Sequence, residues 1–202
     1  MIPIDILVWT GVLTFAAMGA MAAIERRFDL LGVVVLASVT AVGGGSLRDV
    51  VVGQLPPAIF RDERLLWGVL GTALAVFVLR HRLKRLRRPI YWLDTLGLGL
   101  FAALGAERGL DAGLGFWGTI FAGAVSGVGG GVLRDVLTGE VPGILYRNRD
   151  LYATAATAGA ATVFALHRLD PSHMTLAVAA GAIVAIVTRI AGPVLGLRLP
   201  RG

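Results

Sequence analysis

Two arginine–aspartate pairs, Arg48–Asp49 and Arg134–Asp135, lie inside or near the ends of long apolar stretches of this sequence. A charged side chain within a bilayer usually faces protein or water and is paired with an opposite charge, because its exposure to lipid is costly. Neighbouring residues on a helix point about 100° apart, so we predict pairs between the two motifs, Arg48 with Asp135 and Arg134 with Asp49. The alternative is that these residues lie at the membrane surface and extend their charged ends into water.

Three consecutive glycines precede each pair. They are Gly43, Gly44 and Gly45 in the first copy and Gly129, Gly130 and Gly131 in the second. Glycine in a helix costs about 1 kcal/mol relative to alanine, and irregular backbone in a membrane is tolerated only where protein buries it or water fills a cavity beside it. We therefore expect a kink or break at both triplets, which would make the two helices discontinuous. The alternative is close packing of helices through small residues.

Three other polar residues are candidates to line a path through the membrane: Ser46, Ser126 and Asp94. Asp94 lies inside an apolar segment and could be a cavity-facing cation ligand or an interfacial residue. Buried hydroxyl groups more often bond back to helix carbonyl groups, which is the alternative for the two serines.

Several classes of function are excluded by what the sequence lacks. It has no cysteine, which excludes disulfides, thiol nucleophiles and zinc–thiolate sites. It has no Walker, HExxH or GxSxG pattern and no paired catalytic carboxylates, and its glycine triplets lack the GxGxxG spacing of nucleotide loops. We therefore expect that the protein is not an enzyme and that it binds no cofactor and no metal.

The two motifs belong to an internal repeat that needs no gap. At an offset of 86 residues, the separation of Arg48 from Arg134, the segment Val42–Val50 matches Val128–Val136, and the segment Phe15–Gly19 matches Phe101–Gly105. Each unit holds three apolar segments, so the second unit enters the membrane in the opposite orientation. Inverted repeats of this kind are typical of channels and transporters.

The elements that must position these residues are helices in lipid. Of the 202 residues, 56% are hydrophobic and only 16% charged, and the apolar residues form long runs. Seven segments of spanning length can be marked: Ile4–Ile24, Leu30–Val52, Leu65–His81, Pro89–Ala106, Gly113–Thr138, Leu151–Leu166 and Thr175–Ile190. The sequence therefore predicts an all-α membrane protein with a single domain of seven transmembrane helices. Two inverted three-helix repeats, about 4–81 and 89–167, precede a seventh helix, about 172–191, whose expected role is packing.

Basic residues set the expected orientation. The strongest cluster, Arg80–Arg88, follows the third segment and belongs in the cytoplasm. Counting from it places the N-terminus outside and the C-terminus in the cytoplasm, in the cell inner (plasma) membrane. The cytoplasmic side would then hold Arg26, Arg27, Arg147, Arg149, Arg198 and Arg201. The net charge of +6 fits loops at an anionic membrane surface better than binding to nucleic acid.

The pattern GGGxxRDxxxG occurs twice, at Gly43–Gly53 and Gly129–Gly139, in the second and fifth of the seven segments. In this respect the chain resembles the prokaryotic trimeric intracellular cation (TRIC) channel family over nearly its whole length. The resemblance implies a homotrimer in membrane lipids with one pore per protomer, permeable to monovalent cations, with potassium as the main ion and sodium as a second candidate. It further implies that the glycine triplets are pore kinks and that Arg48, Asp49, Arg134 and Asp135 are pore-region charges.

Two other classes of function share these features. A secondary transporter of a small solute such as an amino acid would also have inverted repeats and broken helices, whose positive ends could hold a carboxylate. A membrane scaffold is disfavoured by buried charges that would be costly without a use. Unitary currents would indicate a channel, and saturable uptake would indicate a transporter. The absence of both would indicate a scaffold.

Overall fold

Within residues 4–83, 88–145 and 151–195, which the computed structural model describes, the chain forms seven α-helices joined by short turns. They are α1 (Ile4–Glu25), α2 (Leu30–Val52), α3 (Glu63–Leu83), α4 (Arg88–Asp111), α5 (Phe116–Leu137), α6 (Tyr152–Leu169) and α7 (Met174–Val194). The predicted fold class is confirmed. The residues Lys84–Arg87 of the basic loop, and Arg147, Arg149, Arg198 and Arg201, lie outside the described part of the chain.

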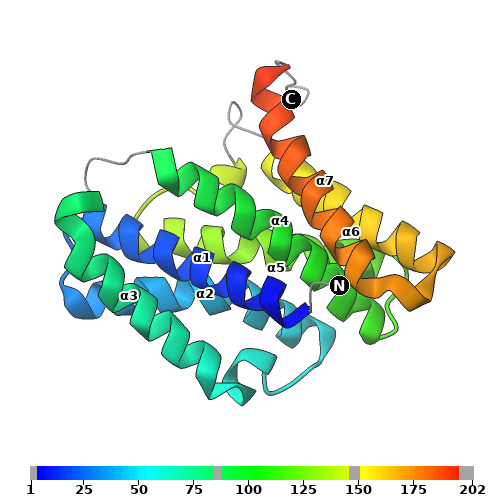
Figure 1. Cartoon of the computed structure of the whole chain (residues 1–202), viewed down its shortest axis with the longest axis horizontal. Helices are drawn as coiled ribbons and strands as arrows, with labels where there is room; N and C mark the ends of the chain where they lie inside the picture. Colours follow the sequence, from blue (N-terminus) through cyan, green and yellow to red (C-terminus); the bar gives the residue numbers. More distant parts are fainter. Residues whose placement is uncertain (1–3, 84–87, 146–150, 196–202) are drawn as a thin grey trace.

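A central group of four helices carries the two motifs. Helices α1, α2, α4 and α5 pack against one another, with α3 on one side and the α6–α7 pair on the other (Figure 1). Five of the described helices, α1, α2, α3, α5 and α7, are long and apolar enough to cross a membrane. Helix α4 carries Asp94 and Glu107, and its contacts with α1, α5, α6 and α7 bury both. This central position explains how a helix with buried charges fits an apolar bundle.

The two repeat units end their middle helices in the same way. Gly53 after α2 and Gly139 after α5 have φ angles of 79° and 73°, a left-handed conformation that glycine adopts without strain. The next amide, of Gln54 or Glu140, donates a 2.8 Å hydrogen bond to the carbonyl group of Asp49 or Asp135. A short 3₁₀ helix follows each turn, η1 at Ala58–Arg61 and η2 at Gly143–Leu145. Equivalent sequences therefore fold into equivalent local structures.

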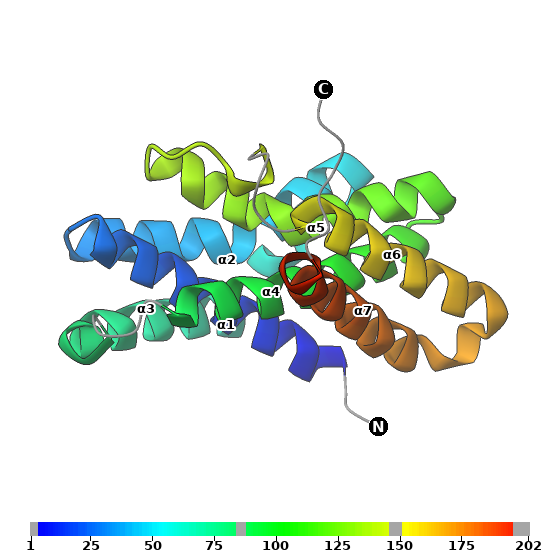
Figure 2. The ribbon, with the colours of Figure 1, turned by 90° about the horizontal axis from the view of Figure 1, so that it is seen from above.

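Helices α2 and α5 run in opposite directions and cross at the glycine triplets (Figure 2). A break is not found, because both helices continue through the triplets without interruption, and the role of the triplets as pore kinks stays a prediction. A Cβ on Gly44 would lie well under 3.0 Å from the Ser126 carbonyl oxygen, and a Cβ on Gly130 equally close to that of Thr40. The structure thus supports the alternative of close packing, since any side chain here would push the two helices apart.

The turn between α6 and α7 is held by Asp170, which is exposed and lies outside the helices. Its carboxylate accepts hydrogen bonds from the Ser172 amide at 2.9 Å and the Ser172 hydroxyl at 2.5 Å, and it lies 2.7 Å from His173 Nδ1. These interactions, with the Ser172 hydroxyl as the largest contributor, lower the pKa of Asp170 to about 2. The ionised form is therefore favoured by the folded turn.

This pairing predicts a dependence of stability on acidity. Because the folded pKa of Asp170 is depressed, its contribution is present above the unfolded value of about 3.9 and is lost as the pH falls toward about 2. We expect the melting temperature of Asp170→Asn to fall less than that of the wild type between about pH 5 and about pH 2. Asp111→Asn, at a more loosely paired exposed site, serves as the control. Equal slopes for wild type and Asp170→Asn would contradict this role.

Candidate functional site

The first motif forms a buried ion pair between adjacent residues of α2. Arg48 Nε and Nη2 donate hydrogen bonds of 2.9 and 2.6 Å to Asp49 Oδ1, and both side chains are buried. Asp49 Oδ2 accepts a 2.8 Å bond from the Ala58 amide of η1, which fixes the carboxylate. Arg48 Nη1 donates a 3.1 Å bond to Ser126 Oγ, so the first motif also contacts α5.

The second motif repeats this arrangement on α5. Arg134 Nε and Nη2 donate bonds of 2.8 and 2.6 Å to Asp135 Oδ1, and Asp135 Oδ2 accepts a 3.0 Å bond from the Gly143 amide of η2. In each repeat a carboxylate bridges a guanidinium group and the backbone of the following 3₁₀ helix, although Gly143 is the counterpart of Pro57 and not of Ala58.

The predicted pairs between the motifs, Arg48 with Asp135 and Arg134 with Asp49, are wrong. Each arginine lies four residues beyond the crossing glycine of its own helix, Gly44 or Gly130, and the helices are antiparallel. With a rise of about 1.5 Å per residue, the two motifs are therefore roughly 12 Å apart along the bundle, on opposite sides of the crossing. Each arginine side chain instead folds along its own helix and reaches the next residue. It is long enough to do so although adjacent side chains leave the helix about 100° apart.

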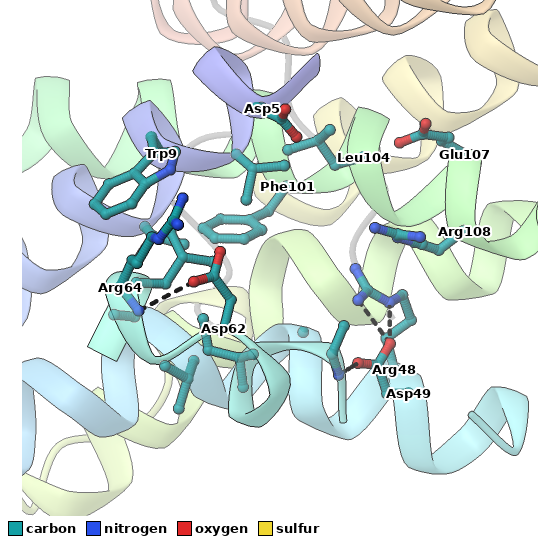
Figure 3. Close-up of a pocket in the computed structure, with 18 residues that line it drawn as sticks. Asp5, Trp9, Arg48, Asp49, Asp62, Arg64, Phe101, Leu104, Glu107 and Arg108 are labelled. Carbon is teal, nitrogen blue, oxygen red and sulfur yellow. Dashed lines mark hydrogen bonds and ion pairs between the residues drawn. The ribbon is translucent and has the colours of Figure 1, made fainter. Parts of the chain in front are cut away.

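A cavity of about 390 Å³ opens beside the first motif, among α1, α2, α3, α4 and η1 (Figure 3). Gly45, the last glycine of the triplet, is part of its wall. Its charged lining consists of four carboxylates and three guanidinium groups: Asp5, Asp49, Asp62, Glu107, Arg48, Arg64 and Arg108. Trp9, Phe101 and Leu104 supply apolar lining.

The second motif faces a much smaller cavity of about 100 Å³, whose wall includes Gly131. Asp94 lines this cavity and is buried between two arginines. Asp94 Oδ1 is 3.5 Å from Arg134 Nη1 and accepts a 3.1 Å bond from the Tyr152 hydroxyl, and Asp94 Oδ2 is paired with Arg189 Nη2. Asp94 is therefore enclosed by residues of α5, α6 and α7. Whether it is a cation ligand or an interfacial residue stays a prediction.

Sequence reasoning missed Arg189 and Tyr152. Arg189 is 3% exposed, and its guanidinium carbon lies 4.3 Å from the centre of the Tyr152 ring. The available signal was its type, since Arg189 is the one charged residue in the apolar segment Thr175–Ile190, and a charge there indicates a function by default. The seventh helix therefore takes part in the charged network besides packing.

The remaining serine candidates differ from one another. Ser126 is fully buried and accepts the bond from Arg48 described above. Ser46 Oγ is also buried, and it has no hydrogen-bond partner among the described residues. Neither position tests whether these serines line a pore, so that role stays a prediction.

Comparison with known proteins gives a consistent result. A protein-family model described as "Glycine transporter" matches residues 5–81 and 91–168, once for each repeat. A UPF0126 membrane protein of Deinococcus radiodurans is 47% identical over 94% of this chain and 87% of its own, and the UPF0126 inner membrane protein YadS of Escherichia coli K12 is 33% identical over 94% and 91%.

Solved structures agree with the sequence matches. The TRIC trimeric intracellular cation channel orthologue from Rhodobacter sphaeroides superimposes with a TM-score of 0.88 at 40% identity, covering 96% of this chain and 98% of that one. A structure described under conductance through TRIC cation channels has a TM-score of 0.89 at 33% identity, covering 100% and 98%. The chain is thus a multi-pass membrane protein homologous to ion channels and not to enzymes. It belongs to the UPF0126 membrane proteins, the prokaryotic TRIC channel family.

Proposed function

We propose that the protein is a homotrimeric channel for monovalent cations, chiefly potassium, with one conduction path in each protomer. The observation that carries this proposal is the pair of cavities that approach the α2–α5 crossing from opposite sides. Each cavity is bounded by the last glycine of a triplet, Gly45 or Gly131, and by an arginine–aspartate pair. A path between them would pass close to the glycine triplets, where the two antiparallel helices cross.

The charges of the larger cavity favour cations. Arg48 is neutralised by Asp49 at 2.6 Å, so the arginine does not present a free positive charge to an approaching ion. The remaining lining has three carboxylates, from Asp5, Asp62 and Glu107, against two guanidinium groups. Such an excess of negative charge raises the local concentration of cations. Asp94, Ser46 and Ser126 are proposed as further lining residues.

The basic loops support the proposed orientation, and the relatives support the proposed assembly. With the N-terminus outside, the C-terminal end of α2 and the larger cavity face outward, and the Asp94 network faces the cytoplasm. Relatives described as trimeric cation channels match nearly the whole chain, which supports a homotrimer. Exposed apolar side chains such as Trp117 (78%) and Leu169 (81%) would then contact lipid or a neighbouring protomer.

A transporter of a small zwitterion such as glycine is a second candidate, favoured by the description of the family model. A cavity of about 390 Å³ with charges of both signs could accommodate an amino acid, its carboxylate facing Arg48. The deciding experiment is recording from purified protein in planar bilayers under a potassium gradient, beside glycine uptake into proteoliposomes. Unitary currents that reverse near the potassium potential support the channel, and saturable uptake without unitary currents supports the transporter.

Because the chain has no cysteine, single thiols can test the path directly. We expect a positively charged thiol reagent applied from outside to reduce the unitary current of Gly45→Cys by roughly half or more, since the adduct would add bulk and charge beside the path. A Cβ at Gly45 meets only Arg48 Nη2 at 3.7 Å, so the variant should fold.

The control for this thiol experiment is Gly71→Cys on α3, where a Cβ has no neighbour within 4 Å. Its current should not change after labelling. Complete labelling of Gly45→Cys, shown by mass, without a change in current would place the path elsewhere. Labelling from the cytoplasmic side alone would reverse the orientation.

A further inference from the structure

The Asp94 network has no counterpart in the first repeat. At the repeat offset, Asp94 corresponds to Val8 and Tyr152 to Leu66, and α7 lies outside the repeat. The larger cavity lies on the first-repeat side of the α2–α5 crossing, whereas the second-repeat side holds two aspartates and two arginines around about 100 Å³. The residues that have no counterpart in the first repeat thus lie at the narrow part of the proposed path.

The negative charge of Asp94 is compensated mainly by Arg189. Arg134 uses Nε and Nη2 on Asp135, and only its Nη1 approaches Asp94, at 3.5 Å. Arg189, by contrast, pairs through Nη2 with Asp94 Oδ2 and donates from Nη1 to the Asp94 carbonyl oxygen at 3.3 Å. Without the Arg189 guanidinium the network would carry one net negative charge in an enclosed space.

Arg189 is itself incompletely satisfied. Its Nε is buried and has no hydrogen-bond partner within the described part of the chain. The guanidinium group also lies over the rings of Tyr152 at 4.3 Å and Tyr91 at 5.3 Å. A group held by the carboxylate and carbonyl oxygens of one aspartate and by ring faces can leave more easily than one whose donors are all used.

We propose that the Asp94 carboxylate and the Tyr152 hydroxyl form a binding site for a permeating monovalent cation, and that the guanidinium group of Arg189 occupies this site and closes the path in the present conformation. This inference rests on the proposed channel function. The cavity of about 100 Å³ has room for an ion with part of its hydration shell, since roughly 10–15 Å³ of such space suffices for one water molecule. Gly131 leaves room for the site, because a Cβ there would lie 2.6 Å from the Tyr152 hydroxyl oxygen.

Removing the tethered cation should open the path, and returning it in soluble form should close it. We expect the open probability of Arg189→Ala to rise about tenfold or more, because an occupant that favours one of two states sets their ratio. Methylguanidinium in the cytoplasmic bath should reverse this increase, and tetramethylammonium, which has no N–H donor, should not. Arg189→Lys keeps a charge that can reach Asp94 and should resemble the wild type.

The matched control is Arg80→Ala on α3. Its guanidinium group donates a 2.9 Å bond to the Phe77 carbonyl oxygen on the same helix and lies 4.3 Å from the centre of the Phe77 ring. Its open probability and its response to methylguanidinium should equal those of the wild type. The inference is overturned if Arg189→Ala opens no more often than the wild type, or if methylguanidinium acts equally on both. Should Arg189→Ala not fold, Arg189→Gln replaces it.

A melting experiment separates failure of this inference from failure of the channel proposal. If folded wild-type protein passes no current, the channel proposal fails independently. Methylguanidinium should still raise the melting temperature of Arg189→Ala, since a ligand of the folded state stabilises it. It should not do so for the double variant Arg189→Ala/Asp94→Asn. Equal shifts for the single and double variants would show that Asp94 forms no such site.

Discussion

Gly44→Ala and Gly130→Ala are each expected to destabilise the protein by about 3 kcal/mol or more, because each adds a methyl group against the backbone of the partner helix. The obstacle in both cases is a carbonyl oxygen, of Ser126 or Thr40, which no side-chain rotation can move. The helices must separate to admit the methyl group, and the contact along α2 and α5 is lost with it. Thermal melting of detergent-purified protein, followed by size-exclusion chromatography, measures the effect.

Two other glycines provide the controls. Gly45→Ala meets only Arg48 Nη2 at 3.7 Å, and Gly71→Ala meets no atom within 4 Å. Both should keep or raise stability, by up to about 1 kcal/mol from the better helix propensity of alanine. Melting of Gly44→Ala at the temperature of Gly45→Ala would show that the helices do not cross as closely as the structure indicates.

Asp94→Ala should be as damaging, at about 3–5 kcal/mol, because it removes one partner of a buried ion pair and leaves the other uncompensated. The stranded group is Arg189, which is 3% exposed and already lacks a partner for its Nε among the described residues. A lower melting temperature and loss of folded yield are the expected results, with unfolding measured in the same detergent as the wild type.

A second substitution tests the cause of this loss. Arg189→Met added to Asp94→Ala removes the stranded charge while keeping an apolar side chain of similar length, so stability should largely return. The exposed pair of Arg108 and Asp111, 3.9 Å apart, gives the contrast: Asp111→Ala should cost about 0–1 kcal/mol. If the double variant is as unstable as Asp94→Ala, then Asp94 stabilises the bundle by some route other than Arg189.

The helices and the repeat could be predicted because their signals are local. Apolar runs of spanning length define the helices, and Gly53 and Gly139 mark the ends of α2 and α5 at equivalent places. Prediction erred most clearly at α4, which runs to Asp111 rather than ending near Ala106. Its last turns carry charges that suggested a loop, whereas the surrounding helices bury Glu107.

The site was predicted less well because it depends on contacts between distant segments. The glycine triplets stood out in the sequence, but helix propensity alone cannot distinguish a broken helix from a close crossing. The approach of Gly44 to the Ser126 backbone shows the crossing. The partners of Arg48 and Arg134 depend on the length of the arginine side chain and on where the two helices cross. A helical wheel shows only the direction of each side chain, so it predicts neither. The role of Arg189 depends on α7 packing against α4, and no spacing in the sequence predicts that contact.

The crossing of α2 and α5 also bears on how the chain arose. Gly44 and Gly130 are counterparts in the repeat, and a Cβ on Gly44 would lie 3.0 Å from the Gly130 nitrogen. Phe15 and Phe101 are counterparts too, and their rings stack with centres 5.0 Å apart. Residues that touch their own equivalents mark a twofold axis, as in a dimer of identical chains. A three-helix ancestor inserted in both orientations would have met itself at these residues, so every mutation there entered the interface twice. Fusion of two such copies would remove that constraint, so that residues such as Asp94 and Tyr152 could differ between the two halves.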